Sequence, residues 1–367
     1  MALHPVKLPK SARYLFRVVV LQKKLLKAIA NPDMNADTVD AAWVRNVWCH
    51  QDAEWVRKFC RGGQESVLHP LRAIAAAPLT ARQSLYSEFC RQNKIVAMLD
   101  TGGNFQSIKD LPGFTTQLVA EVKEFFKRCY KLLSHNERRK WSGYEFKGNG
   151  SINNRSYKDD FCSDYPTRVV CPYCDGEIGS PELDHYLCKS EFPLLACSPW
   201  NLIPVCSSCN KIVTGKGESL AITLGPPHST DDWLHPFFRP TSDDVQIRLN
   251  GPPMDSIPRL HSPDAAEQTR LDNHTGLIRS LSKRWTNTAA GSFDRLVRNV
   301  NKRVTATSHV GKRIAVMNHV GMRLEEHLES RGRAASSMVH AAVCQAVLDW
   351  RPEYIEEFIN PNAPKLA

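Results

Sequence analysis

Two C-x-x-C pairs constrain this chain more than any other feature. Cys171 and Cys174 form the first pair, Cys206 and Cys209 form the second, and thirty-one residues separate them. Each pair can place two thiolates on one ion across a tight turn, so together they complete a tetrahedral four-sulfur site of the kind that binds zinc. No position on such an ion is open to water. We therefore expect a structural zinc whose binding, worth ~10 kcal/mol or more, contributes to folding. The alternative is two redox dithiols or chance pairing.

The rest of the composition is that of a folded protein of two or three domains. The chain has 367 residues and twelve cysteines, and no apolar run reaches the roughly 18 residues of a membrane span. Without a secretory signal, paired cysteines point to a reducing compartment, where they are metal ligands more often than disulfides. We expect a cytoplasmic protein with no membrane segment.

Hydrophobic spacing divides the chain. Leu118, Val122, Phe125 and Cys129 recur at helical intervals and predict a helix from Thr115 onward. The fold class expected is α+β: a mainly helical protein with a small zinc-stabilised module at its centre. The expected parts are a helical domain over 1–145, the zinc module over 146–240, a proline-rich connector with one short strand over 241–270, and a basic helical domain over 271–367.

Charge favours a polyanion as partner. The formal net charge is +10, and between Arg279 and Arg333 twelve Lys and Arg residues stand against four acidic ones. Four of these basic residues fall roughly on one side of a predicted helix: Arg295, Arg298, Lys302 and Arg303. Either this is an ordinary solvated helix face, or the residues contact DNA phosphates.

Further motifs lie within and beside the cysteine pairs. Asp184-His185 comes first, Asn201-Leu202 follows, and the second cysteine pair runs directly into Asn210-Lys211. In this order the sequence resembles the HNH, or ββα-metal, nuclease family over about seventy residues. Cys188 departs from the pattern, because many relatives carry proline there.

The resemblance implies a role for each residue. Asp184 and Asn210 would hold a hard cation, Mg²⁺ or Mn²⁺, His185 would be the general base, and Asn201 would orient the loop and the histidine. Imidazole suits that role because its unperturbed pKa of ~6.5 lets it take a proton near neutral pH. Lys211 and Lys216 would contact phosphate, or are ordinary surface charges.

The resemblance thus predicts an endonuclease that hydrolyses DNA and nicks one strand as a monomer. HNH modules flanked by helices are also similar to effectors of bacterial anti-phage defence systems of the Zorya or Septu type, which implies other defence components as partners. The helices, or the acidic end around 353–357, would then cover the site until activation. The alternatives are a zinc-dependent nucleic-acid-binding protein without catalysis, and an RNase.

Overall fold

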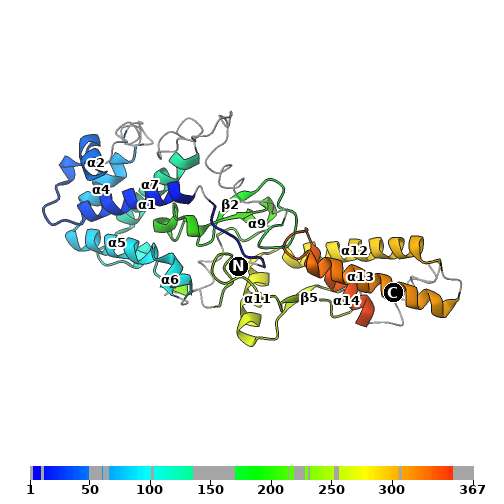
Figure 1. Ribbon diagram of the computed structural model, residues 1–367. Coiled ribbons are helices and arrows are strands. Elements are labelled where there is room, and N and C mark those ends of the chain that lie inside the picture. Colours follow the sequence, from blue (N-terminus) through cyan, green and yellow to red (C-terminus); the bar gives the residue numbers. More distant parts are fainter. Residues whose placement is uncertain are drawn as a thin grey trace, which may run out of the picture.

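The computed structural model describes residues 3–9, 12–48, 60, 66–100, 103–134, 170–213, 215–218, 228–229, 232–251, 256–305 and 308–349. Within these ranges the chain is mainly helical with three small two-stranded sheets, so the α+β expectation is confirmed at that level. The molecule is elongated, with the first helices at one end, the strands in the middle and the last helices at the other end (Figure 1). None of the described helices combines the length and apolarity needed to cross a membrane.

The N-terminal helices are α1 (Ala12–Ile29), α2 (Ala41–Trp48), α4 (Leu68–Ala75), α5 (Leu79–Gln92), α6 (Ile95–Asp100) and α7 (Thr116–Ser134). Their apolar stripes face one another. In α7, Leu118, Val122, Phe125, Phe126 and Cys129 are all buried, as their three- and four-residue spacing predicts. Apart from α6, whose Ile95 is buried in the core of the central part, these helices share one hydrophobic core.

The central part contains β2 (Glu182–His185), β3 (Leu202–Val205) and the short helix α9 (Ser207–Asn210). β2 and β3 pair antiparallel, with Asp184 opposite Ile203 and His185 opposite Leu202. Short 3-10 turns at Pro193–Leu195 and Pro199–Asn201 shape the loop between the strands. A second small sheet is formed by β1 (Asn104–Phe105) and β4 (His228–Ser229), which pair antiparallel.

The loop between β2 and β3 enters the N-terminal core. Leu194, Ala196 and Cys197 are buried among the residues of that core. Gln22 of α1 donates to Cys197 Sγ at 3.6 Å, and Asn93 just after α5 donates to the Leu194 carbonyl at 3.3 Å. The helices therefore pack directly on the hairpin.

The proline-rich segment is more ordered than the sequence predicts. It contains two strands, β5 (Gln246–Arg248) and β6 (Arg259–His261), which pair antiparallel. Ile247 and Leu260 are buried on the same core as the central part and the last helices. The one short strand that the sequence predicts in this segment is present as β5, and its partner β6 was not predicted.

The last helices are α11 (Ala265–Leu277), α12 (Leu281–Arg303), α13 (His309–Glu329) and α14 (Ser337–Asp349). α12 buries one face, formed by residues such as Trp285, Phe293 and Val300, and turns its charged face outward. α14 is buried along most of its length, so it is a core helix. The predicted acidic cover at 353–357, like the predicted domain boundary at 145, falls outside the described residues.

Candidate metal centre and hydrolytic site

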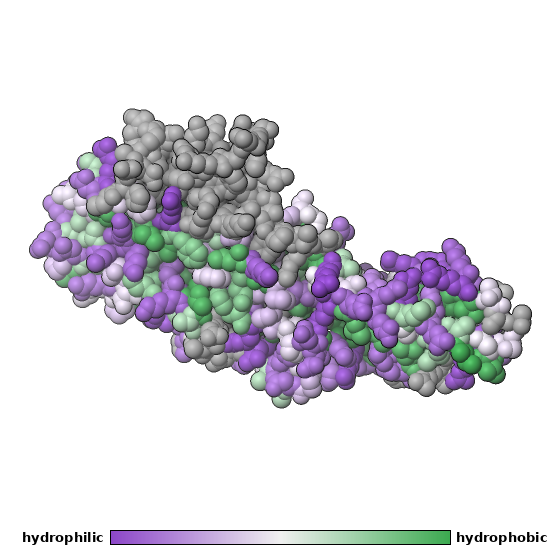
Figure 2. All heavy atoms as spheres, in the orientation of Figure 1, coloured by the Kyte–Doolittle hydropathy of each residue, from purple (hydrophilic) through white to green (hydrophobic). Residues whose placement is uncertain are grey.

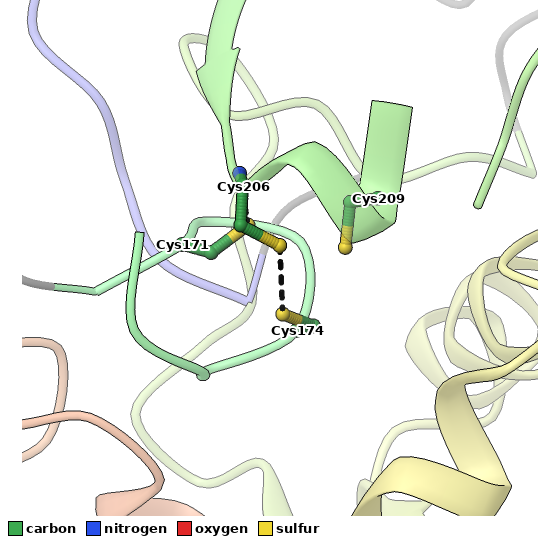
Figure 3. Close-up of side chains that lie close together, drawn as sticks. All are labelled: Cys171, Cys174, Cys206 and Cys209. Carbon is green, nitrogen blue, oxygen red and sulfur yellow. Dashed lines mark hydrogen bonds between the residues drawn. The ribbon is translucent and has the colours of Figure 1, made fainter. Parts of the chain in front are cut away.

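The four cysteines of the two C-x-x-C pairs meet at one point. Cys171 and Cys174 lie on a loop, Cys206 precedes α9 and Cys209 lies within it (Figure 3). All four are buried, and their sulfur atoms lie within 4.8 Å of one another. Cys174 Sγ and Cys206 Sγ are 3.8 Å apart, which is the ~3.8 Å spacing that a tetrahedral ion with zinc–sulfur bonds of ~2.3 Å imposes. The cluster can therefore hold a zinc ion.

Local backbone geometry builds the first knuckle. The amide of Asp175 donates to the Cys171 carbonyl at 3.1 Å, and Asp175 has a φ of +58°, a conformation that usually selects glycine. Its side chain accounts for the exception. One carboxylate oxygen accepts from His4 Nε2 at 2.8 Å and the other from the Met338 amide at 2.8 Å. These two bonds connect the loop of Cys171 and Cys174 to His4, near the start of the chain, and to Met338 of α14.

Arg284 of α12 lies against the sulfur atoms. Its guanidinium donates to Cys174 Sγ at 3.4 Å and to Cys209 Sγ at 3.3 Å. Four thiolates around Zn²⁺ carry a net charge of −2, so a guanidinium beside them reduces the buried charge. Burial alone would lower the pKa of Arg284, but the neighbouring cysteines, Cys209 first, hold it above its usual value.

Asp184 is buried, and its carboxylate is paired with a positively charged side chain. Its Oδ2 accepts from the Tyr173 hydroxyl at 2.9 Å, and its Oδ1 lies 3.2 Å from Lys216 Nζ. The same ammonium donates to the carbonyls of His185 and Gly217, each at 3.0 Å. Burial raises the pKa of Asp184, and the charge of Lys216 partly offsets this.

The position of Lys216 corrects the sequence prediction. Its side chain is 0 % exposed, so it does not lie on a phosphate-facing surface. Gly215 brings it there: a Cβ on Gly215 would lie 2.1 Å from the Cys209 carbonyl oxygen, so only glycine allows the chain to fold back against α9. The Lys216 amide then donates to that carbonyl at 2.9 Å.

His185 points away from Asp184, because adjacent residues of a strand face opposite sides. Its Nε2 lies 3.1 Å from the Ala196 carbonyl, and the ring of Tyr130 from α7 packs edge-on at 4.7 Å between centroids. Only 8 % of the residue is exposed. Burial, followed by the charge of Lys189, lowers the pKa of His185 to about 3.

The two asparagines have different partners. Asn201 is fully buried; its amide oxygen accepts from the Leu187 amide at 2.7 Å and its nitrogen donates to the Leu187 carbonyl at 3.0 Å, so it braces the β2–β3 loop. Asn210 donates to Glu182 Oε2 at 2.7 Å. Glu182 and Asp184 share one face of β2, two residues apart, but no contact joins Asn210 to Asp184 in the described part of the chain.

The predicted cation site is therefore not assembled in this conformation. The Lys216 ammonium lies beside the Asp184 carboxylate, and the side-chain nitrogen of Asn210 donates to Glu182. Lys211, in contrast, is exposed, as are Arg295, Arg298, Lys302 and Arg303 of α12. Hydrophilic side chains gather over this helix (Figure 2).

The sequence did not single out four residues that shape the site. Arg284 and Tyr130 belong to segments distant in sequence, and Tyr173, although it lies within the first C-x-x-C pair, carries no signal for its contact with Asp184. Glu182 could have been found, because its spacing of two from Asp184 places both carboxylates on one strand face.

No protein family, curated protein or solved structure matches this chain. The structure by itself shows four clustered cysteines that can hold a metal ion, beside the strands β2 and β3 and the helix α9.

Proposed function

We propose that this chain is a nuclease of the HNH class that hydrolyses DNA. One observation carries the proposal: His185 sits on a hairpin, followed by a short helix and anchored by four cysteines, with one ring nitrogen fixed by a main-chain carbonyl. A carbonyl only accepts, so the nitrogen facing Ala196 bears the proton. Nδ1 is then left with its lone pair, and no other hydrogen bond to the His185 ring is found among the described residues.

That lone pair suits a general base. Such a group must be unprotonated and oriented before it takes a proton from water. The Ala196 carbonyl fixes the tautomer, and burial keeps the imidazole neutral at physiological pH. A pKa of about 3 makes a weak base, so we expect the covered histidine to be a less effective base than a hydrated one. Displacing Tyr130 would rehydrate the ring and bring its pKa toward the ordinary ~6.5.

The surface supports a polyanionic substrate. The chain carries a formal net charge of +10, and Arg298, Lys302 and Arg303 lie exposed on α12, whose first turn carries the Arg284 that contacts the cysteines. Basic side chains on one helix attract phosphates whatever the sequence. One site cuts one strand, so we expect nicked plasmid before linear product.

Supercoiled plasmid tests the proposal. The wild type should convert it to the nicked form, and His185→Ala should not. His261→Ala, which removes a half-buried histidine from β6, is the matched control and should remain active. Zinc content of each preparation should equal one ion per chain, which shows that a loss of activity is not a loss of fold. Parallel reactions with Mg²⁺, Mn²⁺ or EDTA test the predicted metal requirement, and an RNA arm tests the RNase alternative.

A zinc-dependent nucleic-acid-binding protein without catalysis is the second candidate, and two observations favour it. The Lys216 ammonium is paired with the Asp184 carboxylate, and the Tyr130 ring packs against the His185 imidazole. This candidate predicts DNA binding with no nicking by the wild type under any metal condition. A role in anti-phage defence stays a prediction that these experiments do not address.

A further inference from the structure

A second candidate site lies between the C-terminal helices, away from the cysteines, and is open to solvent on the side of Arg295. A cavity of about 260 Å³ lies between α12, α13 and α14. Its polar lining consists of Ser292, Arg295 and Asn299 from α12, Arg323 and His327 from α13, and His340 from α14. Leu296 and Cys344 form the apolar part of the wall.

Most of these polar groups have no partner within the described residues. Arg323 donates to Glu326, and the rings of His327 and His340 lie 5.1 Å apart between centroids. Beyond these contacts, none of the six side chains makes a hydrogen bond or ion pair in the described part of the chain. Nδ1 of His340 is buried without a partner. One buried unpartnered nitrogen, in a cavity that is also lined by two guanidinium groups, points to a ligand at this place.

The charges define that ligand as an anion. Two guanidinium groups, from Arg295 and Arg323, line the cavity with two imidazoles. The facing carboxylate, Glu326, is largely exposed and engaged by Arg323. Burial, then the neighbouring cationic groups, lowers the pKa of both histidines, that of His340 to about 4. A transition metal is a poor occupant: only the four cysteines bring three or more ligand atoms together among the described residues, and the arginines repel a cation.

We propose that this cavity binds a phosphate group, with Arg295 as its principal ligand and with His327 and His340 taking up a proton as the anion enters. Guanidinium, amide and hydroxyl donors match the oxygens of a phosphate. The phosphate belongs either to the backbone of a nucleic acid or to a free nucleotide, and the chemistry of recognition is the same. The inference is independent of the nuclease proposal, because it concerns binding at a different site.

Calorimetric titration of the full-length His185→Ala protein with sulfate tests the proposal without interference from cleavage. Sulfate does not titrate between pH 6 and 8, so any pH dependence of binding comes from the protein. We expect one saturable site per chain, tighter binding at pH 6 than at pH 8, and proton uptake when buffers of different ionisation enthalpy are compared. Protonation is opposed by Arg295 from α12 and Arg323 from α13, and that of His340 also by His327; it is favoured by Glu326 from α13.

Arg295→Gln should weaken sulfate binding ~10-fold or more, because a charge-assisted hydrogen bond is lost. Arg313→Gln, which removes an equal charge from the exposed face of α13 outside the cavity, is the control and should bind as the wild type does. His327→Gln should reduce the proton uptake. Absence of saturable binding by the wild type, or equal binding by Arg295→Gln, overturns the proposal.

Two competitors separate the sources of phosphate. A duplex without terminal phosphates that displaces sulfate assigns the cavity to the nucleic-acid backbone. Adenosine monophosphate that displaces sulfate where the duplex does not assigns it to a free nucleotide. If neither displaces sulfate, the phosphate assignment is wrong and the cavity is only a sulfate site.

Discussion

The ammonium group of Lys216 lies 3.2 Å from the carboxylate of Asp184, and both side chains are withdrawn from solvent. The sequence places these two residues in roles that require each to be free, one for a cation and the other for a phosphate. In the structure each satisfies the other, and the Tyr173 hydroxyl completes the arrangement.

Lys216→Met should destabilise the protein strongly. It leaves the Asp184 carboxylate buried without its counter-charge, a change that costs ~3–5 kcal/mol in comparable pairs. Urea unfolding with zinc in excess measures the effect. Lys109→Met, which removes the ammonium from the exposed pair with Glu191, should cost under ~1 kcal/mol. A double variant with Asp184→Asn should recover part of the loss; equal losses in single and double variants would show that the pair is not coupled.

Arg284→Gln should weaken zinc binding. The guanidinium contacts three of the four sulfur atoms and offsets their charge, and groups of this kind change metal affinity by ~10–100-fold. Competition with a chromophoric chelator measures the change. Lys283→Gln removes an exposed charge from the preceding position of α12 and serves as the control. Unchanged zinc affinity in Arg284→Gln would contradict a role for these contacts.

Tyr130→Ala should raise the pKa of His185. Removing the ring that packs edge-on against the imidazole admits water, so the pKa should move from about 3 toward ~6.5. Imidazole NMR signals followed across a pH titration report the change. Tyr86→Ala removes a half-buried aromatic from the same helical core without contacting His185, and its His185 signals should titrate as in the wild type. If His185 governs nicking, Tyr130→Ala should also nick faster.

His235 should make the protein less stable as the pH falls. Its Nδ1 accepts from the Phe237 amide at 3.2 Å, and burial holds its pKa well below the ordinary value. The folded state thus keeps the ring neutral, while the unfolded state binds a proton below ~6.5. Stability is present above that pH and is lost as the pH falls, with a slope of up to ~1.4 kcal/mol per pH unit.

His235→Gln isolates this contribution. Both proteins release zinc in acid, so the difference between their slopes of unfolding free energy from pH 7 to pH 5.5 belongs to the histidine. We expect the variant to have the shallower slope. His69→Gln changes a histidine that is 78 % exposed and should leave the slope as it is. Parallel curves for His235→Gln and the wild type would contradict the prediction.

The sequence predicted the features that depend on short-range patterns. The helix expected from Thr115 is α7, because its apolar stripe repeats within nineteen residues. The cysteines meet because each C-x-x-C spacing forms a knuckle by itself, and four sulfur ligands tolerate almost any length of chain between the pairs.

Features that depend on distant packing were not predicted. Lys216 is a surface residue by type, and only the return of the chain at Gly215 toward a carboxylate thirty-two residues earlier buries it. The strand β6 is short and lies among prolines, and its residue Leu260 is buried in the same core as Ile247 of β5, which the sequence did predict. The cover of His185 comes from Tyr130, which belongs to a different hydrophobic core.

The insertion of Leu194, Ala196 and Cys197 into the N-terminal core has a practical consequence. The carbonyl that fixes the His185 tautomer belongs to a residue whose side chain is anchored among those helices. A fragment that contains only the four cysteines and the strands between them would expose these apolar loop residues to water. The Ala196 carbonyl would then no longer be held in place against the His185 ring. The β2–β3 hairpin and the N-terminal helices are thus packed as one unit, so a movement of these helices would also move the His185 side chain.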